Sequence, residues 1–272
     1  MTKEARKQNA GGGAMRFRTA GFVGMFLILV AAALLVWGSN NFAALPVDDL
    51  LERAYTYLAI GAFRGEARWT AEAAELFERA AAGDPSSAEA HLMAAMSLQA
   101  LGRIQEAIAY YETVRDLAPS FPVDAMIGDA YFAAGDLEDA EAAYLRALEV
   151  EPESVLALSG LARLTERTGR LTDSEMYLRR IIRITAPEPG AYLELAAFFL
   201  RHGAPDSALA VLEEVDEERR TGAAYHGQLG FVYEALDRRD EACSELRTAL
   251  RLGSNDADVT AAIERLGCTP RP

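Results

Sequence analysis

A small residue recurs along this chain at intervals of 34, 33, 34, 34 and 34 residues, and this period constrains the fold more than any other feature. The recurring positions are Gly61, Ala95, Gly128, Ala162, Ala196 and Gly230. A second small residue follows each of them after twelve positions: Ala73, Ala107, Ala140, Ser174, Ala208 and Ala242. Two tracks in one register, repeated six times, indicate six copies of one structural unit.

Larger apolar residues keep the same register. Four positions after the second small residue stand Phe77, Tyr111, Tyr144, Leu178, Leu212 and Leu246, and three positions later stand Ala80, Val114, Ala147, Ile181, Val215 and Ala249. Positions i, i+4 and i+7 share one face of an α-helix, so this face of each unit is predicted to be buried. The turn glycines Gly102, Gly135, Gly169 and Gly203 stand where a preceding helix must end. Each unit is therefore a predicted helical hairpin, and since one hairpin cannot bury its apolar face, the hairpins must stack.

With this period and these residues, the chain resembles the tetratricopeptide repeat family, with six repeats in residues 48–254. The resemblance implies an all-α, right-handed superhelical solenoid of helix-turn-helix repeats whose first helices line a concave groove. Two repeats depart from the pattern, because Arg68 and Asp237 stand where the others carry the turn Gly. Residues 255–272 are expected to form a capping helix and tail, with Asp256 as N-cap.

The N-terminal segment has a different character. Residues 20–38 contain no charged side chain, and 19 helical residues span about 30 Å, the thickness of a bilayer core. Residues 1–19 form a basic tail and residues 39–47 a linker before the repeats. The basic flank predicts a single-pass signal-anchor with its N-terminus in the cytoplasm and the repeats on the far side of a bacterial inner membrane. The alternative is a cleaved signal peptide, which would release the repeats as a secreted soluble protein.

Charge limits the partners that the repeats can bind. The net charge is −14, and the first 18 residues contribute five basic and one acidic side chain, so the rest of the chain carries −18. Such an acidic surface opposes nucleic acid and anionic lipid headgroups as general partners. Proteins or peptides, and a membrane reached through residues 20–38, remain the expected partners.

The two cysteines are Cys243, near the start of the sixth repeat's second helix, and Cys268, just past the capping helix. If these helices form a hairpin that turns near Asn255, the two cysteines are neighbours, since they stand 12 residues before and 13 after it. An oxidising compartment would join them in a disulfide, whereas otherwise they are two reduced, buried, small apolar residues.

The sequence contains no recognisable catalytic chemistry. The three histidines have neither a nucleophile nor a carboxylate at a diagnostic spacing, and no phosphate-loop, dinucleotide or zinc-hydrolase motif is present. We therefore predict no enzymatic activity, no cofactor and no metal site.

The family's groove can be projected onto this sequence, and it predicts a surface of two characters. Apolar and aromatic side chains dominate one part, and arginines the other. The candidate groove residues are Tyr55, Leu58, Leu92, Met96, Gln99, Phe132, Arg163, Arg167, Leu193, Arg201 and Phe231. Clustered arginines would suit a peptide with an apolar part and a carboxylate. Alternatively, these arginines pair with Glu166 and neighbouring acids on the surface.

Together these features predict a membrane-anchored interaction scaffold with its repeats in the periplasm. Such a protein would be an assembly factor or accessory subunit of a membrane or envelope complex. The alternatives are a secreted binding protein and an accessory protein to an enzyme.

Overall fold

The computed structural model of the chain describes residues 45–186 and 188–268, which contain thirteen α-helices and no strand. The helices are α2 (Val47–Arg64), α3 (Ala67–Gly83), α4 (Ala88–Ala100), α5 (Ile104–Leu117), α6 (Asp124–Ala134), α7 (Leu137–Val150), α8 (Val155–Arg167), α9 (Leu171–Thr185), α10 (Pro189–Arg201), α11 (Pro205–Glu213), α12 (Ala223–Ala235), α13 (Arg239–Arg251) and α14 (Ala257–Leu266). A short 3-10 turn, η2 (Glu217–Arg219), separates α11 from α12. The predicted membrane segment, residues 20–38, lies outside the described residues. Within the described ranges, no helix combines the length and the apolar character needed to cross a bilayer.

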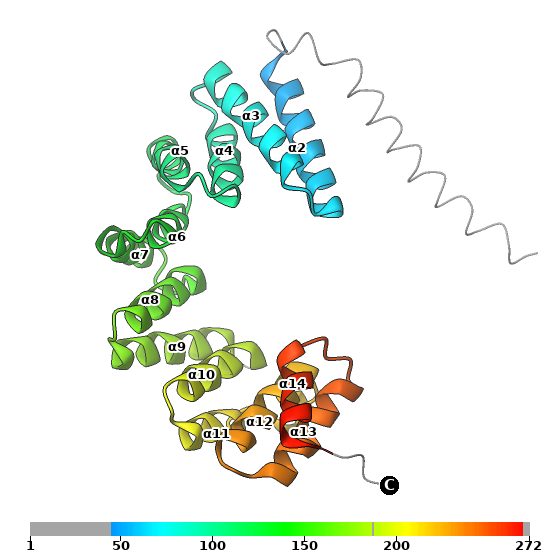
Figure 1. The fold of residues 1–272 in the computed structure, drawn as a ribbon. Helices are drawn as coiled ribbons and strands as arrows, with labels where there is room; N and C mark the ends of the chain where they lie inside the picture. Colours follow the sequence, from blue (N-terminus) through cyan, green and yellow to red (C-terminus); the bar gives the residue numbers. More distant parts are fainter. Residues whose placement is uncertain (1–44, 187, 269–272) are drawn as a thin grey trace, which may run out of the picture. The chain divides into compact units, whose positions relative to one another are not determined.

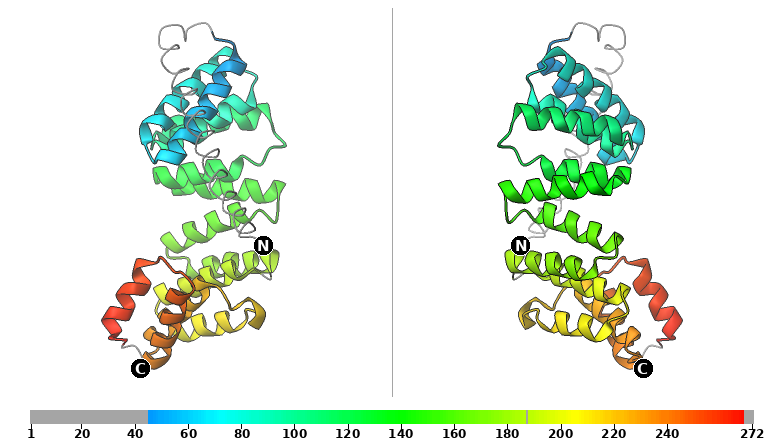
Figure 2. Two further views of the ribbon diagram at one scale, coloured as in Figure 1. Left: turned by 90° about the vertical axis from the view of Figure 1, so that its right-hand side faces the viewer. Right: turned by 90° about the vertical axis from the view of Figure 1, so that its left-hand side faces the viewer.

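The described part of the chain divides into two compact units, with the boundary between residues 117 and 118. In the first unit, α2 pairs with α3 and α4 with α5 as helical hairpins. In the second, the hairpins are α6–α7, α8–α9, α10–α11 and α12–α13, with α14 packed on α13 (Figure 1; Figure 2). The predicted order of six hairpins followed by a capping helix is what the described residues form.

The repeat positions make the core. All four tracks of small and large residues identified in the sequence are buried in every repeat. The tightest packing surrounds Tyr144 of α7, whose side chain is fully buried. A Cβ added at Gly128 of α6 would lie 2.5 Å from the Tyr144 ring, and one added at Gly160 of α8 only 2.2 Å from it. The ring therefore fills a slot between two first helices that only residues without a side chain can form.

The turns follow the sequence prediction in four repeats and correct it in one. Gly102, Gly135, Gly169 and Gly203 all have positive φ, as a helix-ending turn requires. In the first repeat the expected turn position, Arg68, lies inside α3 instead. Gly65 (φ 66°) ends α2 there, so α3 begins earlier in its repeat than α5 does.

Asp237 supplies the sixth repeat's turn with a conformation that suits glycine better. Its φ is 59°, and it is the one non-glycine residue with positive φ in the described part of the chain. We expect Asp237→Gly to raise the free energy of unfolding by about 0.5–1 kcal/mol, because glycine adopts this conformation without a Cβ penalty. Chemical denaturation measures the change. Asp237→Ala is the control and should lower stability, so a gain from both variants would contradict the turn's role.

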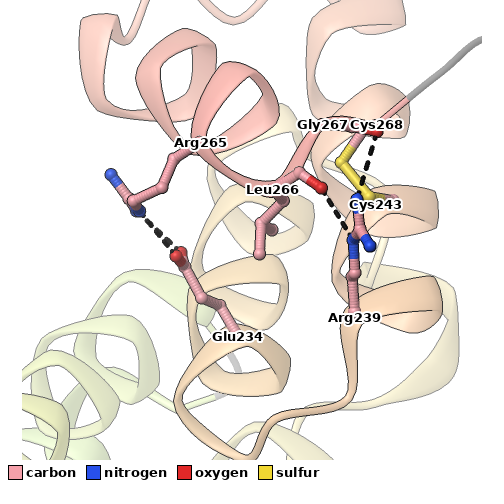
Figure 3. Close-up of a disulfide and its surroundings, with 7 residues drawn as sticks. All are labelled: Glu234, Arg239, Cys243, Arg265, Leu266, Gly267 and Cys268. Carbon is pink, nitrogen blue, oxygen red and sulfur yellow. Dashed lines mark hydrogen bonds and ion pairs between the residues drawn. A yellow bond between two sulfur atoms is a disulfide. The ribbon is translucent and has the colours of Figure 1, made fainter.

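The capping helix α14 is held by few apolar contacts and several specific bonds. Val259 and Ala262 are its buried residues, packed against α13. The Asp256 side chain accepts a hydrogen bond from the Asp258 N–H at 2.8 Å, which confirms the predicted N-cap. Figure 3 shows that Cys243 and Cys268 form a disulfide, with their Cα atoms 5.4 Å apart.

Candidate interaction surface

We name the exposed side chains of α6, α8, α10 and α12 the first-helix face of the second unit, and polar bridges join α6 to α8 and α8 to α10. Arg163 of α8 donates to Asp129 of α6 at 2.5 Å. Arg201 of α10 donates to both oxygens of Glu166 of α8, at 2.9 and 3.0 Å. Each bridge joins the first helix of one repeat to that of the next.

A further bridge joins α12 to the capping helix. Arg265 of α14 donates to both carboxylate oxygens of Glu234 on α12, each at 2.8 Å (Figure 3). Glu234 holds the same repeat position as Glu166, so α14 takes the place of a seventh first helix. These bidentate pairs are exposed and add little stability individually, but each joins two neighbouring helices with a defined geometry.

Glu166 is the most heavily bonded carboxylate on this face. Besides Arg201 it contacts His202 Nε2 at 2.9 Å. The Arg201 hydrogen bond lowers the pKa of the Glu166 carboxyl below its ordinary value; the His202 contact acts in the same direction, and partial burial opposes both. Glu166 is therefore ionised at neutral pH, and its charge is balanced within the fold.

Asp129 connects this face to the core. Its Oδ1 accepts from Arg163 and also from the buried Tyr144 hydroxyl at 2.7 Å. Burial raises the pKa of Tyr144, and the hydrogen bond to Asp129 raises it further, so the hydroxyl stays protonated and remains a donor. Tyr144, whose ring packs against Gly128 and Gly160, thus also orients a surface ion pair.

An aromatic ring on α6 carries two guanidinium groups from α8. The Cζ atoms of Arg163 and Arg167 each lie 5.2 Å from the centroid of the Phe132 ring. Arg163 is also bonded to Asp129, whereas Arg167 forms no ion pair with any described residue. Cation–π contact orients Arg167 while leaving its N–H donors available.

A pocket of about 430 Å³ opens between α10, α12 and α14. Ala197, Leu200 and Phe231 supply its apolar lining. The polar lining is Arg201, Gln228, Asp258 and Arg265. Both arginines are already bridged to glutamates, so the pocket offers an apolar site within a pre-ordered polar rim.

The candidate residues of the first unit lie on α2 and α4. The Tyr55 hydroxyl donates to Glu89 at 2.6 Å, again from one first helix to the next, and burial together with this bond raises its pKa to about 12. Gln99 accepts from the Tyr111 hydroxyl at 2.7 Å. Leu58 is half-buried against the unit's core and Leu92 is half-buried, while Met96 is exposed.

The structure changes the interpretation of the predicted arginine cluster. Arg163 and Arg201 are paired with acids, as the surface-pairing alternative stated, and Arg167 alone of the three remains without a carboxylate among described residues. Leu193 is half-buried against the core. Arg201 and Phe231 do meet, in the pocket.

Sequence reasoning missed the pocket residues of α14, Asp258 and Arg265. A signal was available, because Arg265 follows Glu234 by 31 residues and Arg201 follows Glu166 by 35, a difference of about one helical turn. The capping interpretation of α14 hid this correspondence.

Within residues 45–186 and 188–268, no group of three or more His, Cys, Asp or Glu side chains could hold a metal ion. His91 is buried with Nδ1 2.8 Å from the Ser87 carbonyl, and His226 Nδ1 lies 2.7 Å from Glu245.

Comparisons with known proteins agree with this architecture. Family models described as tetratricopeptide repeat match residues 67–127 and 125–189. Cellulose synthase operon protein C of Xanthomonas axonopodis pv. citri is 31% identical over 75% of this chain and 14% of that protein. Anaphase-promoting complex subunit CDC16 of Saccharomyces cerevisiae is 20% identical over 78% of this chain and 26% of that protein.

Among solved structures, a tetratricopeptide repeat protein from Parabacteroides merdae superposes with a TM-score of 0.59 at 21% identity, covering 87% of this chain and 89% of that one. The chain spans a minor part of both curated relatives, so these likenesses bear on the repeats and their fold. The described residues form an all-helical tetratricopeptide-repeat solenoid, which confirms the predicted repeat architecture.

Proposed function

We propose that this tetratricopeptide-repeat chain is a non-enzymatic scaffold that holds partner proteins or peptides on the first-helix face of its second unit. The observation that carries the proposal is the apolar pocket of α10, α12 and α14, two of whose lining arginines, Arg201 and Arg265, are held by glutamates of α8 and α12. Because the bridges order the polar side chains beforehand, a partner loses less free energy in ordering this surface.

The partner's chemistry follows from what remains unsatisfied on this face. Leu200 and Phe231 can receive a large apolar side chain, which is the usual anchor of an interface. Arg167, stacked on Phe132, can donate to a carboxylate. A segment with both groups matches this surface.

The proposed setting is the bacterial inner membrane, with residues 20–38 as the anchor and the repeats in the periplasm. The Cys243–Cys268 disulfide supports an oxidising compartment for the repeats. The relatives named for an operon and for a subunit of a complex support a role within a multi-protein assembly.

Co-purification tests this function. Tagged full-length protein is compared with residues 39–272 exported behind a cleavable signal, and partners are identified by mass spectrometry. Recovery of the same partner at fixed stoichiometry by both forms is expected. Recovery only by the full-length chain would assign recognition to the N-terminal segment, and no stoichiometric partner with either form would remove the scaffold proposal. A mature N-terminus near residue 39 in the full-length sample would instead indicate a secreted protein.

Reversing the charge of Arg167 tests the surface. We expect Arg167→Glu to weaken the affinity for the recovered partner at least about tenfold, because a charge-assisted hydrogen bond is lost and a repulsion between like charges is added. Titration of the purified partner measures this change. Arg183→Glu, on the exposed side of α9, is the matched control and should bind normally. Equal affinity of both variants would place the partner elsewhere.

A further inference from the structure

A second pocket, which we name the terminal pocket, lies between α13 and the residues that follow α14, away from the first-helix face. Its volume is about 670 Å³. Three arginines line it, Arg239, Arg247 and Arg251, against a single acid, Asp240. On a chain with 41 acidic and 27 basic residues, this excess of cations is unusual.

In two earlier repeats, the equivalent side of the second helix contacts an arginine at the start of the next repeat's second helix. Arg103, just before α5, reaches Glu78 of α3 at 3.4 Å. Arg170, just before α9, donates to both oxygens of Glu141 of α7, each at 2.8 Å. In both cases an arginine of the later second helix binds an acid on the earlier one, within one unit.

At the terminal pocket neither of these two positions carries an acid, and one of them carries an arginine. By repeat register, Glu78 corresponds to Arg247 and Glu141 to Cys243. The position at which Glu78 offers a carboxylate therefore holds a guanidinium on α13, and the position of Glu141 holds no acid. A helix that packs beside α13 in the same way would therefore need acidic side chains where the earlier second helices have arginines.

The same pocket also offers apolar contact. Leu250 lines it with 39% of its surface exposed, and the Cys243–Cys268 disulfide forms part of its wall. Among the described residues, no second helix follows α14 to cover this side of α13. Arg251 donates one hydrogen bond to Thr248 of its own helix, and its guanidinium has further N–H groups that can donate to a ligand.

We propose that the terminal pocket docks an acidic amphipathic helix of a partner protein. The helix lies beside α13 in the place that the next second helix takes in earlier hairpins. Its apolar side contacts Leu250, and its carboxylates bind Arg247 and Arg251. This surface is separate from the first-helix face, so an experiment can disprove this proposal without disproving the proposed function, and the reverse.

The test uses the full chain in mild detergent and a stapled, fluorescein-labelled 14-residue helix with Leu on one face and Glu on the other. A peptide with Gln in place of Glu is the control probe. Fluorescence anisotropy should show the Glu peptide binding at least about tenfold more tightly than the Gln peptide, with affinity falling as salt rises. Arg247→Glu/Arg251→Glu should abolish this preference, and Arg247→Gln/Arg251→Gln should weaken it.

Arg183→Glu is the matched control, because Arg183 holds the repeat position of Arg251 on α9, and it should leave binding unchanged. Circular dichroism and thermal melting confirm that each variant is folded. Equal binding of the two peptides, or undiminished binding by both arginine double variants, would overturn the proposal. So would loss of binding on Arg167→Glu alone, which would assign the peptide to the first-helix face, or full displacement by millimolar inorganic phosphate, which would indicate a general anion site.

Discussion

Gly160→Ala is expected to lower the free energy of unfolding by about 3 kcal/mol. Glycine in a helix normally costs about 0.5–1 kcal/mol relative to alanine, so the opposite sign would be predicted from helix propensity. Here the added Cβ would lie 2.2 Å from Cε1 and 2.3 Å from Cζ of Tyr144. That ring is fully buried and hydrogen-bonded to Asp129, so it can move only by disturbing both the core and the surface ion pair.

Chemical denaturation measures this loss, and Gly190→Ala is its matched control. Gly190 lies in the first turn of α10, and an added Cβ would have no atom within 4 Å, so this variant should be neutral or slightly stabilising. Combining Gly160→Ala with Tyr144→Leu should cost less than the two changes summed, because the smaller side chain relieves the overlap. Additive losses, or an unchanged stability of Gly160→Ala, would contradict the close packing of the Tyr144 ring against Gly160.

Removing the disulfide with Cys243→Ala/Cys268→Ala is expected to cost about 3 kcal/mol, chiefly in the capping helix. The bond closes a loop with a sequence separation of 25 residues, and loops of this size give stabilisation of this order. The helix it retains has ten residues, with two of them buried, so α14 is too short to persist without its attachment.

Hydrogen exchange resolved by residue is the measurement, with α14 expected to lose protection while α6 to α9 keep theirs. Adding reductant to the original protein should reproduce the effect, and the double variant should no longer respond to reductant. Arg265→Gln is the control for a second attachment of α14, the exposed pair with Glu234, and should change protection only slightly. Unchanged protection of α14 in the double variant would show that apolar packing alone retains it.

The fold could be predicted from the sequence because the core positions follow from the repeat pattern alone. Each buried position recurs at the same place in every repeat, so a residue such as Tyr144 is identified by its register before any contact is known. The turn glycines are equally local, since a single φ value decides them. Arg68 shows the limit: the first hairpin turns at Gly65, three residues before the position at which the repeat register places the turn.

The candidate surface was predictable in part. The first helices were identified correctly as the elements that carry Phe132, Arg163, Arg167 and Arg201. Whether an arginine faces a partner or an acid depends on the residue one repeat away, and the side chains of Glu166 and Asp129 decided that for two of the three. The pocket around Phe231 needs α14, which sequence reasoning treated only as a cap.

The sequence by itself determined the repeat, the helical hairpins, the buried tracks and the acidic character, because these depend on period and composition. Only the tertiary structure decided which charges neutralise one another and which surfaces stay open, because ion pairs and pockets depend on side chains about 34 residues apart meeting across a helix interface. Arg247 is an example: the sequence shows which residue stands at the repeat position of Glu78, but the contrast in charge becomes informative only once the structure shows Glu78 binding Arg103 at the start of the next second helix.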